Sequence, residues 1–96
     1  MSKNLDSLID SRPNVRHGRP CVAGTGITVH RIAILHRLGN SPEEIARKYE
    51  HLDLAGIHAA LAYYHANRAE VDDEIAADEE EADRIEAEHS RQWDVA

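Results

Sequence analysis

The stretch from Asp53 to His89 constrains this chain most, because almost nothing in it can break a helix. It holds no proline, and its only glycine, Gly56, falls in the first turn that such a helix would have. Apolar residues recur in it at heptad positions a and d, namely Leu54, Ile57, Leu61, Tyr64, Val71, Ile75, Ala82 and Ile85, with exceptions only at Arg68 and Asp78. Ala, Glu and Asp make up most of the remainder of its second half. We therefore expect one helix of roughly 35 residues, about 50 Å long and longer than any core the chain can build.

The net charge differs in sign between the two parts of the chain. Residues 1–68 contain nine Lys or Arg against six Asp or Glu, whereas residues 69–96 contain two Arg against twelve Asp or Glu. Such asymmetry indicates that the two parts meet different partners. We expect residues 1–68 to form a small module that can approach nucleic acid. We expect residues 69–96 to form an acidic helix and tail that binds a basic protein surface.

Turn residues and capping signals predict the structure of residues 1–68. Prolines and glycines divide residues 1–29 into two or three short strands, with β-prone pieces at 21–22 and 27–29. A first helix is expected over 29–38, and Ser41, Pro42 and Glu44 form a capping box for a second that ends near Glu50. Asp53 can cap the third. The expected fold is mainly α, with short N-terminal strands, a three-helix module and a third helix extended into the acidic region.

The three helices have the order of a helix-turn-helix, which predicts contact with DNA. Base reading favours Arg, Lys, Asn or Gln near the start of the third helix, but its polar face offers only His58, His65, Asn67 and Arg68. These residues favour plain helix packing over base readout, and both interpretations stay open. Seven basic residues are candidate phosphate contacts: Arg12, Arg16, Arg19, Arg31, Arg37, Arg47 and Lys48.

Residues that carry catalysis or bind cofactors form no recognisable set in this sequence. Cys21 is the only cysteine, and His58 and His65 would lie roughly 10 Å apart along a helix, too far for one metal ion. The glycines of residues 18–26 lack the Gly-Lys-Ser/Thr ending of a phosphate-binding loop. We expect no catalytic residue, no metal and no cofactor, so an enzyme is the least favoured class.

Three further features indicate where the protein works. No apolar run approaches the roughly 18 residues of a membrane span. The first ten residues show no signal-peptide pattern, and a lone cysteine forms no internal disulfide. We expect a cytoplasmic protein with no membrane partner.

Several motifs together resemble the domain-of-unknown-function 433 family of bacteria and archaea. They are HGRPCVAGT at 17–25, ITV at 27–29, LGNSPEEI at 38–45, Tyr49, and the run from Leu52 through Ile57 to Leu61. The resemblance covers roughly residues 5–68 and departs at Gly26, where the family usually has arginine. It implies a homeodomain-like helix-turn-helix preceded by strands. It also implies a VapB-like antitoxin of a type II toxin–antitoxin pair, whose partner is a PIN-like ribonuclease.

The acidic region is the part expected to neutralise such a toxin. An amphipathic helix binds in a partner groove through regularly spaced apolar anchors. A basic side chain on it could pair with the carboxylates that hold metal in a PIN-like active site. The candidate toxin contacts are Val71, Ile75, Arg84, Ile85, Arg91 and Trp93. Trp93 lies near the end of the chain, where a frayed terminus is an equal alternative.

The resulting hypothesis is a homodimeric antitoxin that inhibits a PIN-like ribonuclease with its C-terminal segment and represses its own operon by binding DNA. A stand-alone helix-turn-helix regulator, in which the acidic helix only dimerises, is the first alternative. A dimerising interaction module without a toxin is the second.

Overall fold

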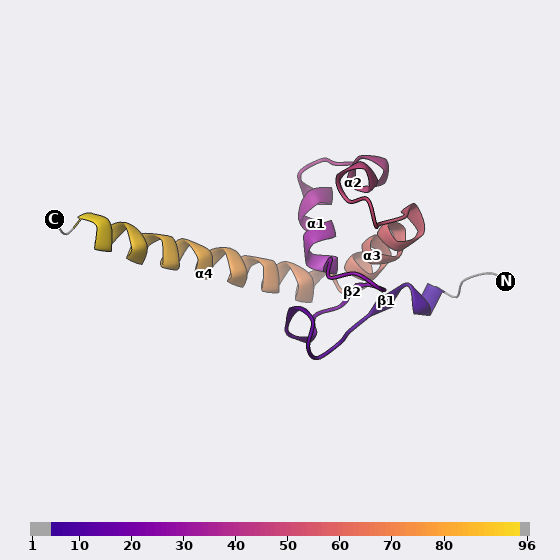
Figure 1. Ribbon diagram of the computed structural model, residues 1–96, viewed down its shortest axis with the longest axis horizontal. Helices are drawn as coiled ribbons and strands as arrows, with labels where there is room; N and C mark the ends of the chain where they lie inside the picture. Colours follow the sequence, from indigo (N-terminus) through magenta and orange to yellow (C-terminus); the bar gives the residue numbers. More distant parts are fainter. Residues whose placement is uncertain (1–4, 95–96) are drawn as a thin grey trace.

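A small module at the N-terminal end continues into one long helix that projects from it (Figure 1). The computed structural model describes residues 5–94, with the side chains of residues 6–90. The elements are η1 (Leu5–Ser7), β1 (Ile9–Asp10), η2 (Arg16–Gly18), β2 (Cys21–Val22), α1 (Val29–Arg37), α2 (Pro42–Lys48), α3 (Leu54–Ala66) and α4 (Arg68–Asp94). This confirms the mainly α fold, with short N-terminal strands and a long C-terminal helix. The molecule measures 63 × 28 × 25 Å.

The strands form a two-stranded antiparallel sheet in which Ile9 pairs with Val22 and Asp10 with Cys21. The expected strand at 27–29 is reduced to a single bridge between Cys21 and Thr28. The reason is that Thr28 caps α1, its side chain accepting a hydrogen bond from the Arg31 backbone amide. Thr28, as the capping residue, is the last residue with an extended backbone, and α1 begins directly after it.

The capping signals read from the sequence are confirmed for α2 and α3. The Ser41 hydroxyl accepts a hydrogen bond from the Glu44 amide at 3.2 Å, and the Glu44 carboxylate accepts one from the Ser41 amide at 3.1 Å. The Asp53 carboxylate accepts a hydrogen bond from the Gly56 amide at 2.8 Å. Each cap satisfies amides that the first helical turn leaves without partners.

The core lies between α3 and the elements around it, namely α1, α2 and the sheet. Its fully buried members are almost all aliphatic, as a chain without phenylalanine requires; the largest are Tyr64, Ile32, Ile45, Ile57, Ile75, Val29, Val71 and Cys21. Val22 packs so close to α3 that a Cβ atom on Gly56 would lie 2.7 Å from its Cγ1 atom. A glycine in the first turn of α3 therefore lets the helix approach the sheet.

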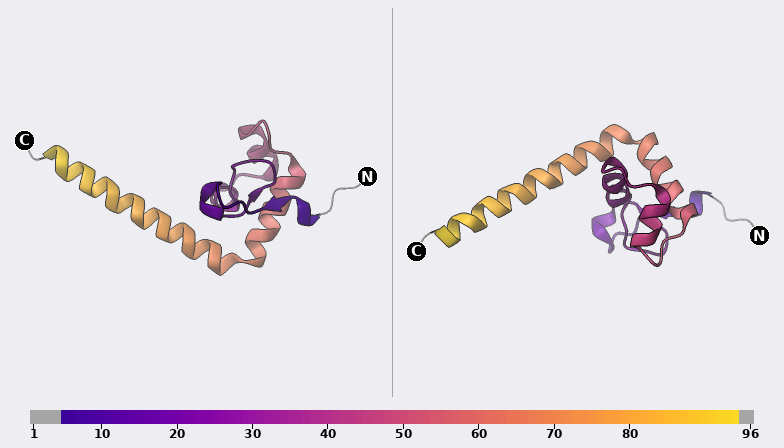
Figure 2. Two further views of the ribbon diagram at one scale, coloured as in Figure 1. Left: turned by 60° about the horizontal axis from the view of Figure 1, so that its bottom comes forward. Right: turned by 90° about the horizontal axis from the view of Figure 1, so that it is seen from above.

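The expectation of one unbroken helix from Asp53 to His89 is wrong, because the chain bends at Asn67 (Figure 2). Asn67 has φ −129° and ψ 36°, and its amide donates to the carbonyls of Tyr63 and Tyr64. Its side-chain nitrogen also donates to the Tyr63 carbonyl, and its own carbonyl accepts from the Val71 amide. One residue thus ends α3 and begins α4, so few backbone hydrogen bonds are lost.

The bend turns the first two turns of α4 back onto the core. Val71 and Ile75 are 2% and 1% exposed there, and they belong to the same cluster as Ile57 and Tyr64. Burying two aliphatic side chains stabilises the fold by about 1.5–3 kcal/mol each. This burial favours the bend, so tertiary packing overrides the helical sequence pattern here.

Beyond its first turns, α4 runs without interruption to Asp94, which confirms the predicted helix through Val71, Ile75 and Ala82. Every side chain from 76 to 90 is exposed. None of the helices in residues 5–94 has the length and apolarity needed to cross a membrane.

Candidate functional site

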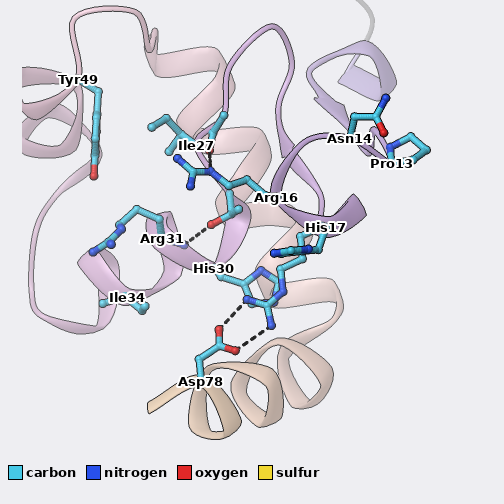
Figure 3. Close-up of a pocket in the computed structure, with 13 residues that line it drawn as sticks. Pro13, Asn14, Arg16, His17, Ile27, His30, Arg31, Ile34, Tyr49 and Asp78 are labelled. Atoms are coloured by element: carbon cyan, nitrogen blue, oxygen red, sulfur yellow. Dashed lines mark hydrogen bonds and ion pairs between the residues drawn. The ribbon is translucent and has the colours of Figure 1, made fainter. Parts of the chain in front are cut away.

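A groove of about 980 Å³ lies between η2, α1 and α4 (Figure 3). Five basic residues line it, namely Arg16, His17, Arg19, His30 and Arg31. Its one carboxylate, Asp78, comes from α4. Ile27, Ile34 and Tyr49 supply apolar surface. We call this the arginine groove.

The η2 turn places two of the basic residues at the groove. Arg16, His17 and Gly18 have φ values of 50°, 58° and 82°, a left-handed conformation that suits glycine but costs other residues about 1–2 kcal/mol each. The Nε atom of Arg16 donates a hydrogen bond to the Gly26 carbonyl at 3.0 Å, which ties the turn to the loop before α1. A Cβ atom at Gly26 would lie 3.7 Å from the same Nε atom. The Arg16 guanidinium therefore occupies the space beside position 26, where the family resemblance leads us to expect an arginine.

Arg19 joins the module to α4. Its two terminal nitrogens donate hydrogen bonds to both carboxylate oxygens of Asp78, at 2.6 and 3.0 Å, and its Nε atom lies 3.7 Å from Oε2 of Glu74. The hydrogen bond from Arg19 is the main cause that lowers the pKa of Asp78, and the same bond raises the pKa of Arg19. We call these three residues the Arg19 latch.

His30 is the one buried polar or charged residue in the described part of the chain, with 4% exposure. Its Nε2 atom lies 3.4 Å from Oε2 of Glu74, close enough for an ion pair if the ring is protonated. Neither ring nitrogen makes a hydrogen bond with the described residues. His30 lines the arginine groove and also a smaller cavity of about 280 Å³ beneath the start of α4.

Asp72 makes a second polar attachment between α4 and the module. It accepts a hydrogen bond from the buried Tyr64 hydroxyl at 2.7 Å, and Arg37 and Arg68 approach it at 3.7 and 3.8 Å. Burial, followed by this hydrogen bond, raises the pKa of Tyr64. The start of α4 is therefore held by apolar packing, by Asp72 and by the Arg19 latch, and this fixes the direction in which the helix leaves.

Residues 9–64, more than half of the chain, match the family described as "Protein of unknown function (DUF433)". This protein belongs to the DUF433 family. A similar solved structure is the crystal structure of a DUF433 member from Anabaena variabilis ATCC 29413. The two chains are 29% identical with a TM-score of 0.68, and the match covers 75% of this chain and 71% of the other. No curated protein matches.

The DUF433 match contains all the basic residues of the arginine groove but stops before α4. Asp78 and Glu74 therefore come from outside the segment that defines the family. The groove joins a DUF433 module to a helix that lies beyond the match.

The predicted phosphate contacts do not gather in one place on the DUF433 module. Arg16, Arg19 and Arg31 line the groove, whereas the remaining four, Arg12, Arg37, Arg47 and Lys48, are outside its lining. Arg12 donates a hydrogen bond to the Thr25 carbonyl at 2.6 Å and lies 3.4 Å from Asp10. Arg12 and Arg19 are thus engaged within the chain, and Arg31 is exposed.

The expected toxin contacts fall into two groups. Val71 and Ile75 are buried in the core of this chain, so the apolar side chains expected to contact a toxin are covered by the module at these two positions. Ile85 is 56% exposed, and Arg84 lies 4.0 Å from Glu81 on the same helix. The side chains of Arg91 and Trp93 lie outside the described residues.

Sequence reasoning missed the contributions of His17, His30 and Asp78 to the groove, and that of Glu74 to the Arg19 latch. A signal for Asp78 was present, because it interrupts the apolar heptad stripe that contains Val71 and Ile75. A charged residue on the face that packs against the module needs a partner there, and Arg19 supplies it. Nothing in the sequence pattern marks His30 in the same way.

Proposed function

We propose that this protein is a VapB-like antitoxin that neutralises a PIN-like ribonuclease with the projecting part of α4 and represses its own operon by binding DNA. One observation carries the proposal. Beyond Asp78, residues 79–90 form a helix in which every side chain is exposed, although short helices that bury no side chain are marginal in water. A partner surface is the natural source of the missing contacts.

The chemistry of this projecting helix fits a ribonuclease. Residues 79–94 contain seven Asp or Glu and two Arg, and Ile85 is a large apolar side chain among them. A protein that cleaves RNA needs a basic surface for the phosphates, and an acidic helix can occupy that surface. By analogy with PIN-like sites, Arg84 or Arg91 would pair with the metal-binding carboxylates.

DNA binding is assigned to the basic module, and most simply to two copies of it. Phosphate contacts from arginines position a protein on DNA, and a dimer doubles their number. A protein of this size buries a modest core, so association with a second copy adds stability. Operon repression then follows from DNA binding near the promoter.

The test compares the full-length protein with a chain that ends at Asp78, using the PIN-like ribonuclease encoded by the neighbouring gene. Ending at Asp78 keeps Val71, Ile75 and the Arg19 latch, so the module stays folded, whereas an end at Arg68 would remove part of the core. We expect the short chain to inhibit RNA cleavage at least about tenfold less well, a difference of 1.4 kcal/mol.

Two measurements make this comparison decisive. Equal thermal unfolding midpoints for the two chains show that the truncation leaves the module intact. Undiminished inhibition by the short chain would assign neutralisation to the module and leave the tail without that role. The absence of any PIN-like gene beside this one would remove the toxin from the proposal.

A further inference from the structure

The arginine groove has the composition of a binding site for the phosphates of a nucleic-acid backbone. Arg16, Arg19 and Arg31 bring three guanidinium groups to its lining, and His17 adds an imidazole, against the single carboxylate of Asp78. The Arg31 guanidinium has no ion pair with the residues that the structure describes. The volume of the arginine groove, about 980 Å³, is at the upper end for ligand sites. The groove therefore accommodates more than one phosphate.

His30 is an independent sign of a ligand at this place. It is 96% buried, lines the groove, and has no hydrogen bond to either ring nitrogen within the described residues. Its Nε2 atom has the Glu74 carboxylate 3.4 Å away, whereas its Nδ1 atom has no partner among the described residues. Buried polar atoms without partners are rare, so Nδ1 calls for a missing partner. An anion in the groove would accept a hydrogen bond from the ring, and Figure 3 shows His30 among the residues that line the groove, close to Asp78.

Asp78 already pairs with one of the three guanidinium groups, that of Arg19, in the way a phosphate would. Its two oxygens accept parallel hydrogen bonds from Arg19, the bidentate geometry that carboxylates and phosphates share. Half of the Asp78 side chain is exposed, so solvent and competing anions reach this pair. The carboxylate of α4 thus takes the place of a ligand at the edge of the groove.

We propose that the arginine groove binds the phosphate backbone of DNA and that Asp78 inhibits this binding by holding Arg19. The proposal rests on the DNA-binding part of the proposed function and adds its site and its regulation. Val71 and Ile75 keep the base of α4 in the core, so DNA displaces only the Asp78 side chain and not the helix. A basic partner that captures Asp78 would free Arg19 and strengthen DNA binding, and DNA would strengthen partner binding by the same factor.

The experiment measures binding of the full-length protein to a duplex from upstream of its gene, by fluorescence anisotropy over a range of salt. Asp78→Asn is compared with Glu79→Gln, which removes the same charge from the next residue, also exposed. We expect Asp78→Asn to tighten binding several-fold more than Glu79→Gln. Its slope of log K against log salt should steepen by about 0.9, because one more phosphate contact forms.

A second pair of variants separates competition for Arg19 from general repulsion. In an Arg19→Gln background, Asp78→Asn should give no more gain than Glu79→Gln. Arg31→Gln should weaken binding and flatten the salt slope, whereas Arg84→Gln on the projecting helix should not. The gain from Asp78→Asn should also appear on a scrambled duplex, because phosphate contacts do not read sequence.

His30→Leu distinguishes a ligand-binding histidine from a structural one. Replacing a buried imidazole that makes no hydrogen bond with an apolar side chain should raise the unfolding temperature. The same variant should bind DNA more weakly, a result that a purely structural role does not give.

Four outcomes would overturn the inference. Equal effects of Asp78→Asn and Glu79→Gln, or a gain that persists without Arg19, would reject inhibition by Asp78. Unchanged binding in Arg31→Gln would reject the groove as the site. Binding by no variant even at low salt would reject this inference together with the repressor role, while toxin inhibition by the full-length protein would still stand.

Discussion

Gly56 shows at the scale of one residue that close packing, and not backbone conformation, can require a glycine. It lies in a regular helical turn, where alanine is favoured by about 1 kcal/mol. Its missing side chain nevertheless leaves room for Val22 on one side and for the capping carboxylate of Asp53 on the other, at 2.7 and 3.3 Å from a Cβ atom. The sheet and α3 meet through this gap.

We predict that Gly56→Ala lowers the free energy of unfolding by about 1 kcal/mol despite the better helix propensity, because overpacking costs about 1–3 kcal/mol. Urea denaturation measures the change. In a Val22→Ala background, where the clash with Cγ1 is absent, the same substitution should be neutral or stabilising. A loss of equal size in both backgrounds would show that Val22 is not the cause.

At the scale of elements, the break at Asn67 marks the limit of what the sequence predicts. The starts of α2 and α3 were predictable because Ser41, Glu44 and Asp53 cap these helices through local hydrogen bonds. The bend was not, since the heptad pattern runs through Asn67 and the packing that favours the bend joins residues far apart in sequence. Asp78 was visible only as an exception in a pattern, because its partner Arg19 is 59 residues away.

Two isoleucines of α4 provide a matched test of where the core ends. Ile75 is 1% exposed and Ile85 is 56% exposed on the same helix. We predict that Ile75→Ala lowers the free energy of unfolding by about 2–5 kcal/mol, as for other buried isoleucines, and Ile85→Ala by less than about 0.5 kcal/mol. Denaturant unfolding of the two variants measures both values. Similar values for the two variants would contradict the division of α4 into a part packed on the core and a projecting part.

At the scale of the whole molecule, the protein combines a packed module and a helix that leaves it. The net charge of −7 is the sum of a positive module and a strongly negative tail. The attachment of α4 at Val71, Ile75, Asp72 and the Arg19 latch sets where that negative charge lies relative to the groove. The two candidate surfaces, one for nucleic acid and one for a protein, are therefore adjacent but distinct.

We predict two stability regions along α4 in hydrogen exchange. Amides from 71 to 75 should be protected almost as well as those of α3, because their side chains are in the core. Amides from 80 to 90 should exchange rapidly in the free protein, since every side chain of this part of the helix is exposed. Binding of the ribonuclease should protect them, and unchanged exchange in the complex would argue against this segment as the contact.

The exposed half of α4 also bears on how long the protein lasts in a cell. Proteases cut segments that open locally, and a helix without tertiary contacts opens far more often than a packed one. In the free chain a protease can therefore cut the projecting part of α4. A partner that covers this part protects it from cleavage. The abundance of this protein would then follow the supply of its partner, so its lifetime reports whether the complex has formed.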